Sequence, residues 1–348
     1  MHAYPPYPGG VGKVVESIST QLVRRGAEVE IVTTDPSCKL KPLETLDGMM
    51  VRRFPSFAPS NAYYLPSPKM LRYVSTLKAD VVHVHNIGAL TTPFCAATLK
   101  ESRNYDRFVV SPHYHEIASN WHTRFFWIPY RPIAKLTLES ANIVQCVSQF
   151  EGEKVKMDMG VSSIVVENGV DEEIYTHHWK GSNDVISLIY VGRLEKYKRV
   201  AMIIRAAEIV KRDGLDIEVK IVGSGSEEHA IKALANEYNV RITIMQNLSR
   251  SDLFKLYSTS DCLVNCSVSE AYSLVTAEAL AIGLPVVVVR PWGRNFSRYL
   301  RAYIANPNPQ SVSDGIRRSR NLNEKSVVRV PTWKEVADKL WTEVYGIT

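Results

Sequence analysis

The sequence has few cysteines, and their positions indicate neither a disulfide framework nor a metal site. Its 348 residues include five cysteines, an odd number, scattered along the chain. Cys146 and Cys262 fall inside apolar, strand-like runs, which suits buried thiols in a reducing compartment. Cys262 and Cys266 have no histidine or further cysteine close by in the sequence to complete a metal site. We therefore expect a fold that depends on neither disulfides nor zinc.

Long apolar runs are also absent, so no segment predicts a membrane-spanning helix. The most apolar stretch, 277–289, contains Glu278 and Pro285. The sequence shows no secretory signal peptide, and we expect a cytoplasmic protein, at the inner face of the membrane if it is peripheral. The net charge is +6, but lysines and arginines alternate with acids and form no stripe. This charge fits anionic small molecules or an anionic membrane surface, and no nucleic-acid partner is expected.

The glycine pattern of dinucleotide-binding oxidoreductases is missing as well. No G-x-G-x-x-G follows the first strand-like run, and the glycines at 223 and 225 lack the third of the set. A dinucleotide-dependent oxidoreductase is therefore a poor candidate.

Strand-like apolar runs alternate with amphipathic helical runs along the whole chain. Such alternation, with nearly continuous apolar strands, is typical of parallel sheets covered by helices on both faces. The expected strands are 29–33, 81–85, 108–111, 143–147 and 164–166 in a first series, and 186–191, 217–222, 242–244, 262–264 and 286–289 in a second.

The length and the two series together predict two domains, because 348 residues exceed one ordinary core. The polar segment 180–184 separates the series and is typical of a linker. We predict an α/β protein whose two doubly wound, Rossmann-like domains face each other across a cleft. Ligands of such sheets bind at the carboxyl ends of the strands.

Glu270 and Glu278 are the most informative pair in the chain. Glu270 falls between the apolar run 261–266 and a helical run over 274–282, and Glu278 falls early in that helix. A helix start favours an anion, so two carboxylates beside it are expected to grip something else, such as sugar hydroxyls. Two glutamates at this spacing are also common as solvated side chains. The preceding strand, the small-residue turn and the stop at 283–285 favour a ligand site.

A basic loop follows the first strand of the second series. In the segment 191–199, Gly192 and Arg193 come directly after the strand, and Lys198 precedes a helix expected over 200–212. Arg193 and Lys198 can therefore reach one anion that also faces the helix start. Two solvated surface cations are the alternative, and the position directly after a strand favours the anion site. Gly223, in Gly-Ser-Gly-Ser-Glu, ends the next strand.

These segments resemble motifs of the retaining GT-B glycosyltransferases of family 4, the group 1 glycosyl transferases. Glu270 and Glu278 match the family's E-x7-E motif, and 192–198 resembles its G-R-L-x-x-x-K segment. The resemblance implies that Glu270 contacts the donor sugar and that Glu278 binds the ribose. It also implies that Arg193, Lys198 and the Ser273, Leu274 and Val275 amides hold the diphosphate, with Gly192 and Gly223 near the nucleotide.

The resemblance extends to both ends of the chain. Pro5, Pro6, Gly9 and Gly10 match a double-glycine loop that closes over the donor phosphates, and His113 matches a histidine that contacts the donor sugar. The family places a hydrophobic strand before that loop, whereas only 1–3 precede it here. We therefore expect the first strand of the N-terminal sheet to be missing from the chain as given, because this start comes too late.

The resemblance also sets the domain limits. It gives an N-terminal, acceptor-side domain over 1–178, rejoined by a final helix over 332–348, and a nucleotide-sugar-binding domain over 179–331. The final helix opens with the capping-box pair Thr332 and Glu335.

The activity that follows is transfer of a hexose-type sugar, with retention, from a nucleotide sugar. No metal or other cofactor is expected, because Arg193 and Lys198 would neutralise the leaving group and the sequence has no Asp-x-Asp triplet. The mixed aromatic and basic segment 121–131 fits an acceptor or membrane-surface patch, and buried helix packing is the alternative. The expected acceptor is a polyprenyl- or lipid-linked saccharide or a cell-envelope glycan. A sugar-nucleotide epimerase of the same architecture and a catalytically silent partner protein stay open.

Overall fold

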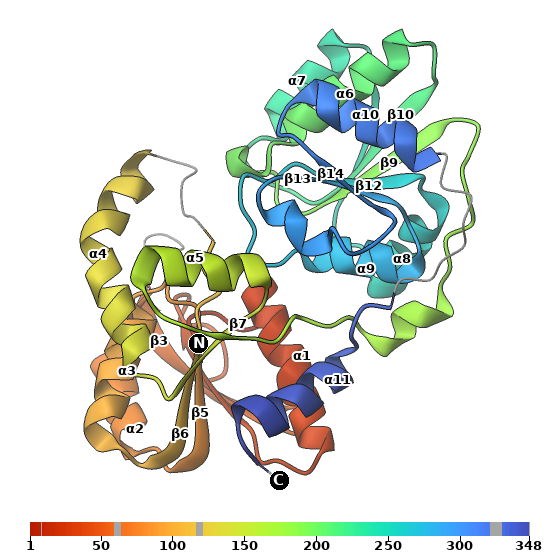
Figure 1. Cartoon of the computed structure of the whole chain (residues 1–348). Helices are drawn as coiled ribbons and strands as arrows, with labels where there is room; N and C mark the ends of the chain where they lie inside the picture. Colours follow the sequence, from red (N-terminus) through yellow and green to blue (C-terminus); the bar gives the residue numbers. More distant parts are fainter. Residues whose placement is uncertain (8, 59–63, 116–120, 321–328, 348) are drawn as a thin grey trace. The chain divides into compact units, whose positions relative to one another are not determined.

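The chain forms two compact α/β units in a computed structural model (Figure 1). Unit 1 comprises Met1–Gly169 and Pro331–Thr348, and unit 2 comprises Val170–Val330. The structure describes residues 1–7, 9–58, 64–115, 121–320 and 329–347, with the backbone alone for 121–126.

The boundary between the units falls after Gly169, nine residues before the predicted boundary at 178, because the segment after Gly169 packs within unit 2. There the hydroxyl of Tyr175 donates a hydrogen bond to the carbonyl of Val330, and the ring of His177 lies against Phe254. Residues from Pro331 onward belong to unit 1, where the Thr332 and Glu335 capping box opens α11 as predicted.

Unit 1 contains two separate four-stranded sheets. In the first, β1 pairs in parallel with β3, which pairs antiparallel with β2 and β4. The second is wholly parallel, in the order β5-β6-β7-β8. The strands are β1 (Glu30–Asp35), β2 (Leu43–Leu46), β3 (Met49–Phe57), β4 (Leu65–Pro66), β5 (Ala79–His85), β6 (Tyr105–Ser111), β7 (Ile143–Cys146) and β8 (Ile164–Val165).

The helices of unit 1 follow the expected alternation. Helix α1 buries Val14, Val15 and Ile18, as its apolar spacing predicts, and it packs against α11. The helices are α1 (Gly10–Arg24), α2 (Pro68–Thr76), α3 (Thr91–Ser102), α4 (Trp121–Glu139), α5 (Gln149–Met159) and α11 (Trp333–Lys339), which continues as a π-helical turn over Leu340–Val344.

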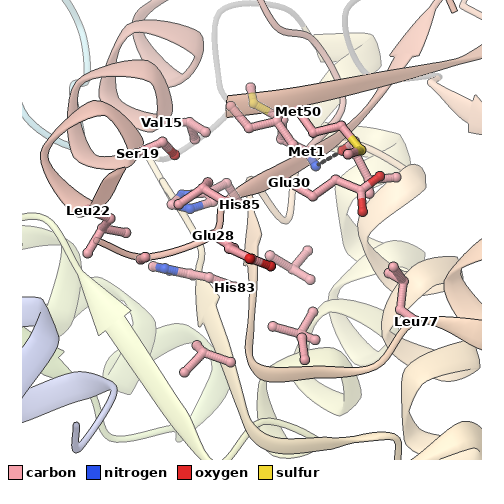
Figure 2. A pocket seen from close by; sticks show the side chains of 18 of the residues that line it. Met1, Val15, Ser19, Leu22, Glu28, Glu30, Met50, Leu77, His83 and His85 are labelled. Atoms are coloured by element: carbon pink, nitrogen blue, oxygen red, sulfur yellow. Dashed lines mark hydrogen bonds between the residues drawn. The ribbon is translucent and has the colours of Figure 1, made fainter. Parts of the chain in front are cut away.

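A cavity of about 1000 Å³ lies in unit 1, beside one edge strand of each of its two sheets (Figure 2). Strands β1 and β5 are the edge strands on this side, and residues of both line the cavity, with Met1, His83 and His85 among them. The Met1 ammonium donates a 2.9 Å hydrogen bond to the carbonyl of Val32, on β1. In the described residues no strand precedes α1.

Unit 2 is built on one six-stranded, fully parallel sheet in the order β11-β10-β9-β12-β13-β14. The chain moves outward from β9 to β11 and then returns to the other side of β9 with β12. The strand order therefore reverses between β9 and β12, where doubly wound sheets bind their ligands. The strands are β9 (Ile186–Val191), β10 (Ile217–Val222), β11 (Arg241–Met245), β12 (Cys262–Asn265), β13 (Val286–Val289) and β14 (Ala302–Ala305).

Helices cover both faces of this sheet. Helices α6 and α10 pack together on one face, and α8 and α9 pack together on the other (Figure 1). The central strands β9, β12 and β13 are buried almost completely, and their valines, isoleucines and leucines account for the continuous apolar runs of the sequence. The helices are α6 (Val200–Arg212), α7 (Glu228–Glu237), α8 (Arg250–Thr259), α9 (Leu274–Ile282) and α10 (Pro309–Arg320), with short 3₁₀ turns at Glu172–Thr176, Lys196–Lys198 and Trp292–Phe296.

Candidate functional site

The place where the strand order of unit 2 reverses, between β9 and β12, brings two sequence motifs together: the basic segment 192–198 and the loop of Glu270. Strand β9 leads into the Gly192 to Lys198 loop, and the adjacent strand β12 leads into the loop that carries Glu270. A backbone hydrogen bond of 2.8 Å from Val268 to Tyr197 ties the two loops to each other. Segments 72 residues apart thus form one polar edge at the carboxyl ends of the strands.

Lys198 and Glu270 form an ion pair across this edge. The Lys198 ammonium lies 2.5 Å from Glu270 Oε1, and both side chains are 16% exposed. The ammonium also lies 5.0 Å from the ring centre of Tyr197, where a cation is attracted by the ring face. The pair places a positive and a negative group side by side, next to the start of α6.

Arg193 lies on the same loop but makes no ion pair with Glu270 in the described residues. Its guanidinium donates a 2.7 Å hydrogen bond to the Tyr197 hydroxyl and is exposed. The Arg193 carbonyl accepts a 2.9 Å hydrogen bond from the Tyr190 hydroxyl, which fixes the loop on β9. Among the described residues Arg193 thus has no carboxylate partner, and its guanidinium is available to an anion.

Gly192 and Gly223 let the loops after β9 and β10 touch through their backbones. Gly223 has φ +148°, and a Cβ there would lie 2.0 Å from the Gly192 carbonyl oxygen. Gly192 has φ +150°, and a Cβ there would lie 2.9 Å from the Tyr190 hydroxyl. Both positions therefore need glycine for the packing of this edge. Their expected approach to a nucleotide stays a prediction.

The start of α9 faces the same polar edge. The first backbone hydrogen bond of the helix runs from Ala277 to the carbonyl of Ser273, so the Leu274 and Val275 amides have no acceptor within the helix. The Ser273 hydroxyl is hydrogen-bonded to Thr276 Oγ1 and accepts from Asn265, and does not cap the helix. These amides and the helix dipole give the edge donors suited to an anion.

Glu278 lies on the second turn of α9 and is 7% exposed. Its Oε1 accepts a 2.8 Å hydrogen bond from Arg250, and its Oε2 lies 3.3 Å from the Tyr257 hydroxyl. Burial raises the pKa of Glu278, and the charge of Arg250 opposes that shift. Sequence reasoning missed Arg250 and Tyr257, because α8 shows no motif and its pairing with α9 appears only in three dimensions.

In unit 1, His113 lies just after β6, and its backbone is in the left-handed conformation, with φ +47°. His113 Nε2 lies 3.0 Å from His85 Nδ1, and the ring of His85 stacks on that of His83 with 4.0 Å between centres. Burial lowers the pKa of His113 and of His83 to about 3, so both imidazoles are neutral. The contact of His113 with a sugar stays a prediction.

Glu151 is a buried carboxyl that sequence reasoning did not find. Its Oε1 accepts from the amide of Tyr114, and its Oε2 accepts from the amide of Val147 at 2.6 Å. It therefore joins the ends of β6 and β7. Burial raises its pKa to about 8. A glutamate three residues after the helix N-cap Ser148 is the signal that could have identified it.

The double-glycine loop of unit 1 runs into α1, with Gly9 as the N-cap and Gly10 as the first residue of the helix. A Cβ added at Gly9 or Gly10 would meet no atom within 4 Å, so the fold leaves room at both positions. Their expected contact with donor phosphates stays a prediction.

Three other expectations concern metals, membranes and the aromatic segment. Among the described residues no group of three or more His, Cys, Asp or Glu side chains could hold a metal ion. No described helix has the length and apolar character needed to cross a membrane. The side chains of 121–126 lie outside the described residues. Beyond them, Trp127 stacks on Tyr114 at 5.2 Å, as buried packing predicts, whereas Ile128 is 66% exposed.

Comparison with known proteins agrees with this architecture. The family model "Glycosyl transferases group 1" matches residues 176–326, and the model "Glycosyltransferase Family 4" matches residues 8–174. An uncharacterised glycosyltransferase of Methanocaldococcus jannaschii is 26% identical over 82% of this chain and 78% of its own length. The D-inositol 3-phosphate glycosyltransferase of Mycolicibacterium smegmatis is 26% identical over 82% of this chain and 72% of its own.

Solved structures show the same fold. Sucrose-phosphate synthase from Thermosynechococcus elongatus superposes with a TM-score of 0.75 at 18% identity, over 97% of this chain and 94% of that one. Anabaena HepE in complex with UDP and glucose gives a TM-score of 0.69 at 16% identity, over 97% and 93%. The fold is thus that of the GT-B glycosyltransferases. Within that class, the chain belongs to glycosyltransferase family 4.

Proposed function

We propose that this glycosyltransferase moves a hexose-type sugar from a nucleotide-sugar donor with retention of the anomeric configuration. The observation that carries the proposal is the polar edge of unit 2, where Lys198 pairs with Glu270 beside the start of α9. Cations, free amides and carboxylates converge there at the reversal point of the sheet. A nucleotide sugar requires each of these groups, since it joins a diphosphate to hydroxyl-rich rings.

The proposed roles follow from charge and position. Arg193, Lys198 and the amides of Ser273, Leu274 and Val275 stabilise the departing diphosphate, because its charge grows as the glycosidic bond breaks. Glu270, held by Lys198, orients the sugar hydroxyls. Glu278 accepts hydrogen bonds from the ribose. His113 orients the sugar from unit 1, and Gly9 and Gly10 contribute backbone amides.

Retention and metal independence belong to the same proposal. No carboxylate is assigned as a covalent nucleophile, so the acceptor hydroxyl attacks the face from which the diphosphate departs. The fixed cations of the edge take the part that a divalent metal would otherwise play at the leaving group. Full activity in the presence of EDTA is the expected result.

For the acceptor we propose a lipid-linked saccharide or a cell-envelope glycan. The support is the outer face of α4, where Ile128 and Leu136 are each 66% exposed beside the exposed Arg131 and Lys135. Exposed apolar groups next to cations suit an anionic membrane surface. Two relatives have names that indicate a small polar acceptor for those proteins instead. They are the D-inositol 3-phosphate glycosyltransferase of Mycolicibacterium smegmatis and the N-acetyl-alpha-D-glucosaminyl L-malate synthase of Bacillus anthracis.

One experiment tests donor, stereochemistry and acceptor together. The protein is incubated with UDP-, GDP- and ADP-hexoses and with either short-chain polyprenyl-linked sugars or inositol phosphate, and proton NMR reads the anomeric coupling of the product. The expected product keeps the donor's anomeric configuration and forms on the lipid-linked acceptor. A product with inverted anomeric configuration would contradict retention. Exclusive use of inositol phosphate would contradict the proposed lipid-linked acceptor. Donor conversion without any acceptor would indicate an epimerase.

A further inference from the structure

Arg250, on α8, lies between two carboxylates of unit 2. One guanidinium nitrogen, Nη2, lies 2.8 Å from Glu278 Oε1 and 2.9 Å from Asp171 Oδ2. The guanidinium carbon stands 4.6 Å from the ring centre of Phe254, one turn further along α8. Arg250 is therefore fixed on three sides, by two ion pairs and one ring face.

We propose that Arg250 is a positioning residue of the donor site, which keeps Glu278 ionised and oriented before a nucleotide binds. The inference rests on the proposed role of Glu278 at the ribose. It assigns to Arg250 an effect on donor affinity that acts through Glu278 and requires no contact with the donor.

Burial is the reason that Glu278 needs such a partner. The side chain is 9% exposed, and a buried carboxylate without a compensating charge takes up a proton instead. The groups that face it are Arg250, the Tyr257 hydroxyl and Asp171. Asp171 has the same charge as Glu278 and opposes its ionisation. Arg250 and the Tyr257 hydroxyl both favour the ionised form, and Arg250 has the larger effect because it is the only positive charge among these three groups.

Ribose recognition requires that ionised form. A carboxylate is an acceptor on both oxygens, whereas a carboxylic acid presents a proton to one of the hydroxyls. Arg250 and Tyr257 occupy one acceptor position on each oxygen. The remaining lone pairs can accept from two ribose hydroxyls without displacement of Arg250.

The link to Asp171 adds a second constraint. Asp171 directly follows Val170, the first residue of unit 2, so the same guanidinium ties α8, α9 and the start of this unit together. Removal of Arg250 would leave two acidic side chains facing each other. Protonation of the more buried one, Glu278, is then the expected response.

The test is calorimetric titration with UDP, ADP and GDP at pH 6, 7 and 8 of the unchanged protein, R250M and R250K. R241M is the matched control, since Arg241 pairs with Asp216 on the surface of the same unit, with both side chains more than half exposed. A melting curve for each variant verifies that it is folded.

The expected result is that R250M binds the preferred nucleotide about tenfold more weakly than the unchanged protein at pH 6 and recovers as the pH rises to 8, since one pKa unit is a factor of ten. The unchanged protein, R250K and R241M should show the same affinity at all three pH values. Equal, pH-independent binding by folded R250M would overturn the inference. So would a loss in R250K that is as large and as pH-dependent as in R250M. Absence of binding by the unchanged protein would overturn the proposed donor site itself.

Discussion

The ammonium of Lys198 lies 2.5 Å from a carboxylate oxygen of Glu270, and the two residues come from adjacent loops at the reversal point of the second sheet. The pair explains how a carboxylate can stand where a diphosphate is expected to bind. Lys198 compensates the charge of Glu270 in the free protein and remains close enough to the edge to serve an incoming anion.

Replacement of Lys198 by alanine is expected to lower kcat by about 10²- to 10³-fold, the usual cost of removing one preorganised group that stabilises developing charge. Steady-state kinetics with the preferred donor measures the loss. K232A is the control, because Lys232 forms an exposed pair with Glu228 on α7 and should keep full activity. A K198A enzyme with unchanged kcat would refute the role assigned to the pair.

The contact between Gly192 and Gly223 predicts a stability difference. In G223A the new Cβ would lie 2.0 Å from a backbone oxygen, at a φ that L-residues rarely adopt. We expect G223A to lose about 3 kcal/mol of the free energy of unfolding, measured in urea. G10A should be unchanged or slightly more stable, because open space surrounds that position. Equal stability of the two variants would contradict the described backbone contact.

Glu151 predicts a pH dependence of the stability of unit 1. Burial raises its pKa from 4.5 to about 8, so the folded protein holds a proton over this interval that the unfolded chain has released. Its contribution to stability is therefore full below pH 4.5 and is lost as the pH rises through 8. The slope between these values is at most about 1.4 kcal/mol per pH unit.

The variant E151Q cannot titrate at this position. Urea unfolding at pH 5, 7 and 9 should show a loss of stability in the unchanged protein that is smaller in E151Q. If both proteins lose stability in parallel, Glu151 does not hold the proton.

The capping box of α11 predicts a modest stability effect. The Thr332 hydroxyl accepts from the Glu335 amide, and Glu335 Oε2 accepts from the Thr332 amide at 2.8 Å. T332A should lose about 1 kcal/mol of the free energy of unfolding. T342A is the control on the same terminal segment, where the hydroxyl only bonds the preceding turn of the helix. A loss in T342A as large as in T332A would contradict the capping role.

The predicted strands and several helices are confirmed because they depend on local periodicity. The run 200–212 and the run 274–282 coincide with α6 and α9, since their apolar residues repeat at helical spacing and the ends are marked.

Strand β3 was not predicted, because its two adjacent arginines interrupt the alternation of apolar and polar residues that indicates a strand. Arg53 is 3% exposed and pairs with Glu44 on β2, so a charged residue occupies a buried position through a partner nine residues away. Strand β14 was missed because two of its four residues are alanines, which have weak strand propensity, and most of it is only half-buried.

The ion pairs of the site could not be predicted for a related reason. Lys198 and Glu270 were each found through a motif, but their contact joins positions 72 residues apart. Arg250 belongs to no motif, and its significance depends on the burial of Glu278 on another helix. Such contacts depend on the order of the strands in the sheet, and the hydrophobic periodicity of the sequence does not reveal that order.

Thermal unfolding with UDP, ADP and GDP, on the unchanged protein and on E278A, tests whether Glu278 forms part of a nucleotide-binding site. A ligand that binds the folded state raises the melting temperature once its concentration well exceeds the dissociation constant. We expect the nucleotide of one base to raise the melting temperature of the unchanged protein and to have no effect on E278A. No shift with any of the three, or an equal shift in both proteins, would contradict a donor site built around Glu278.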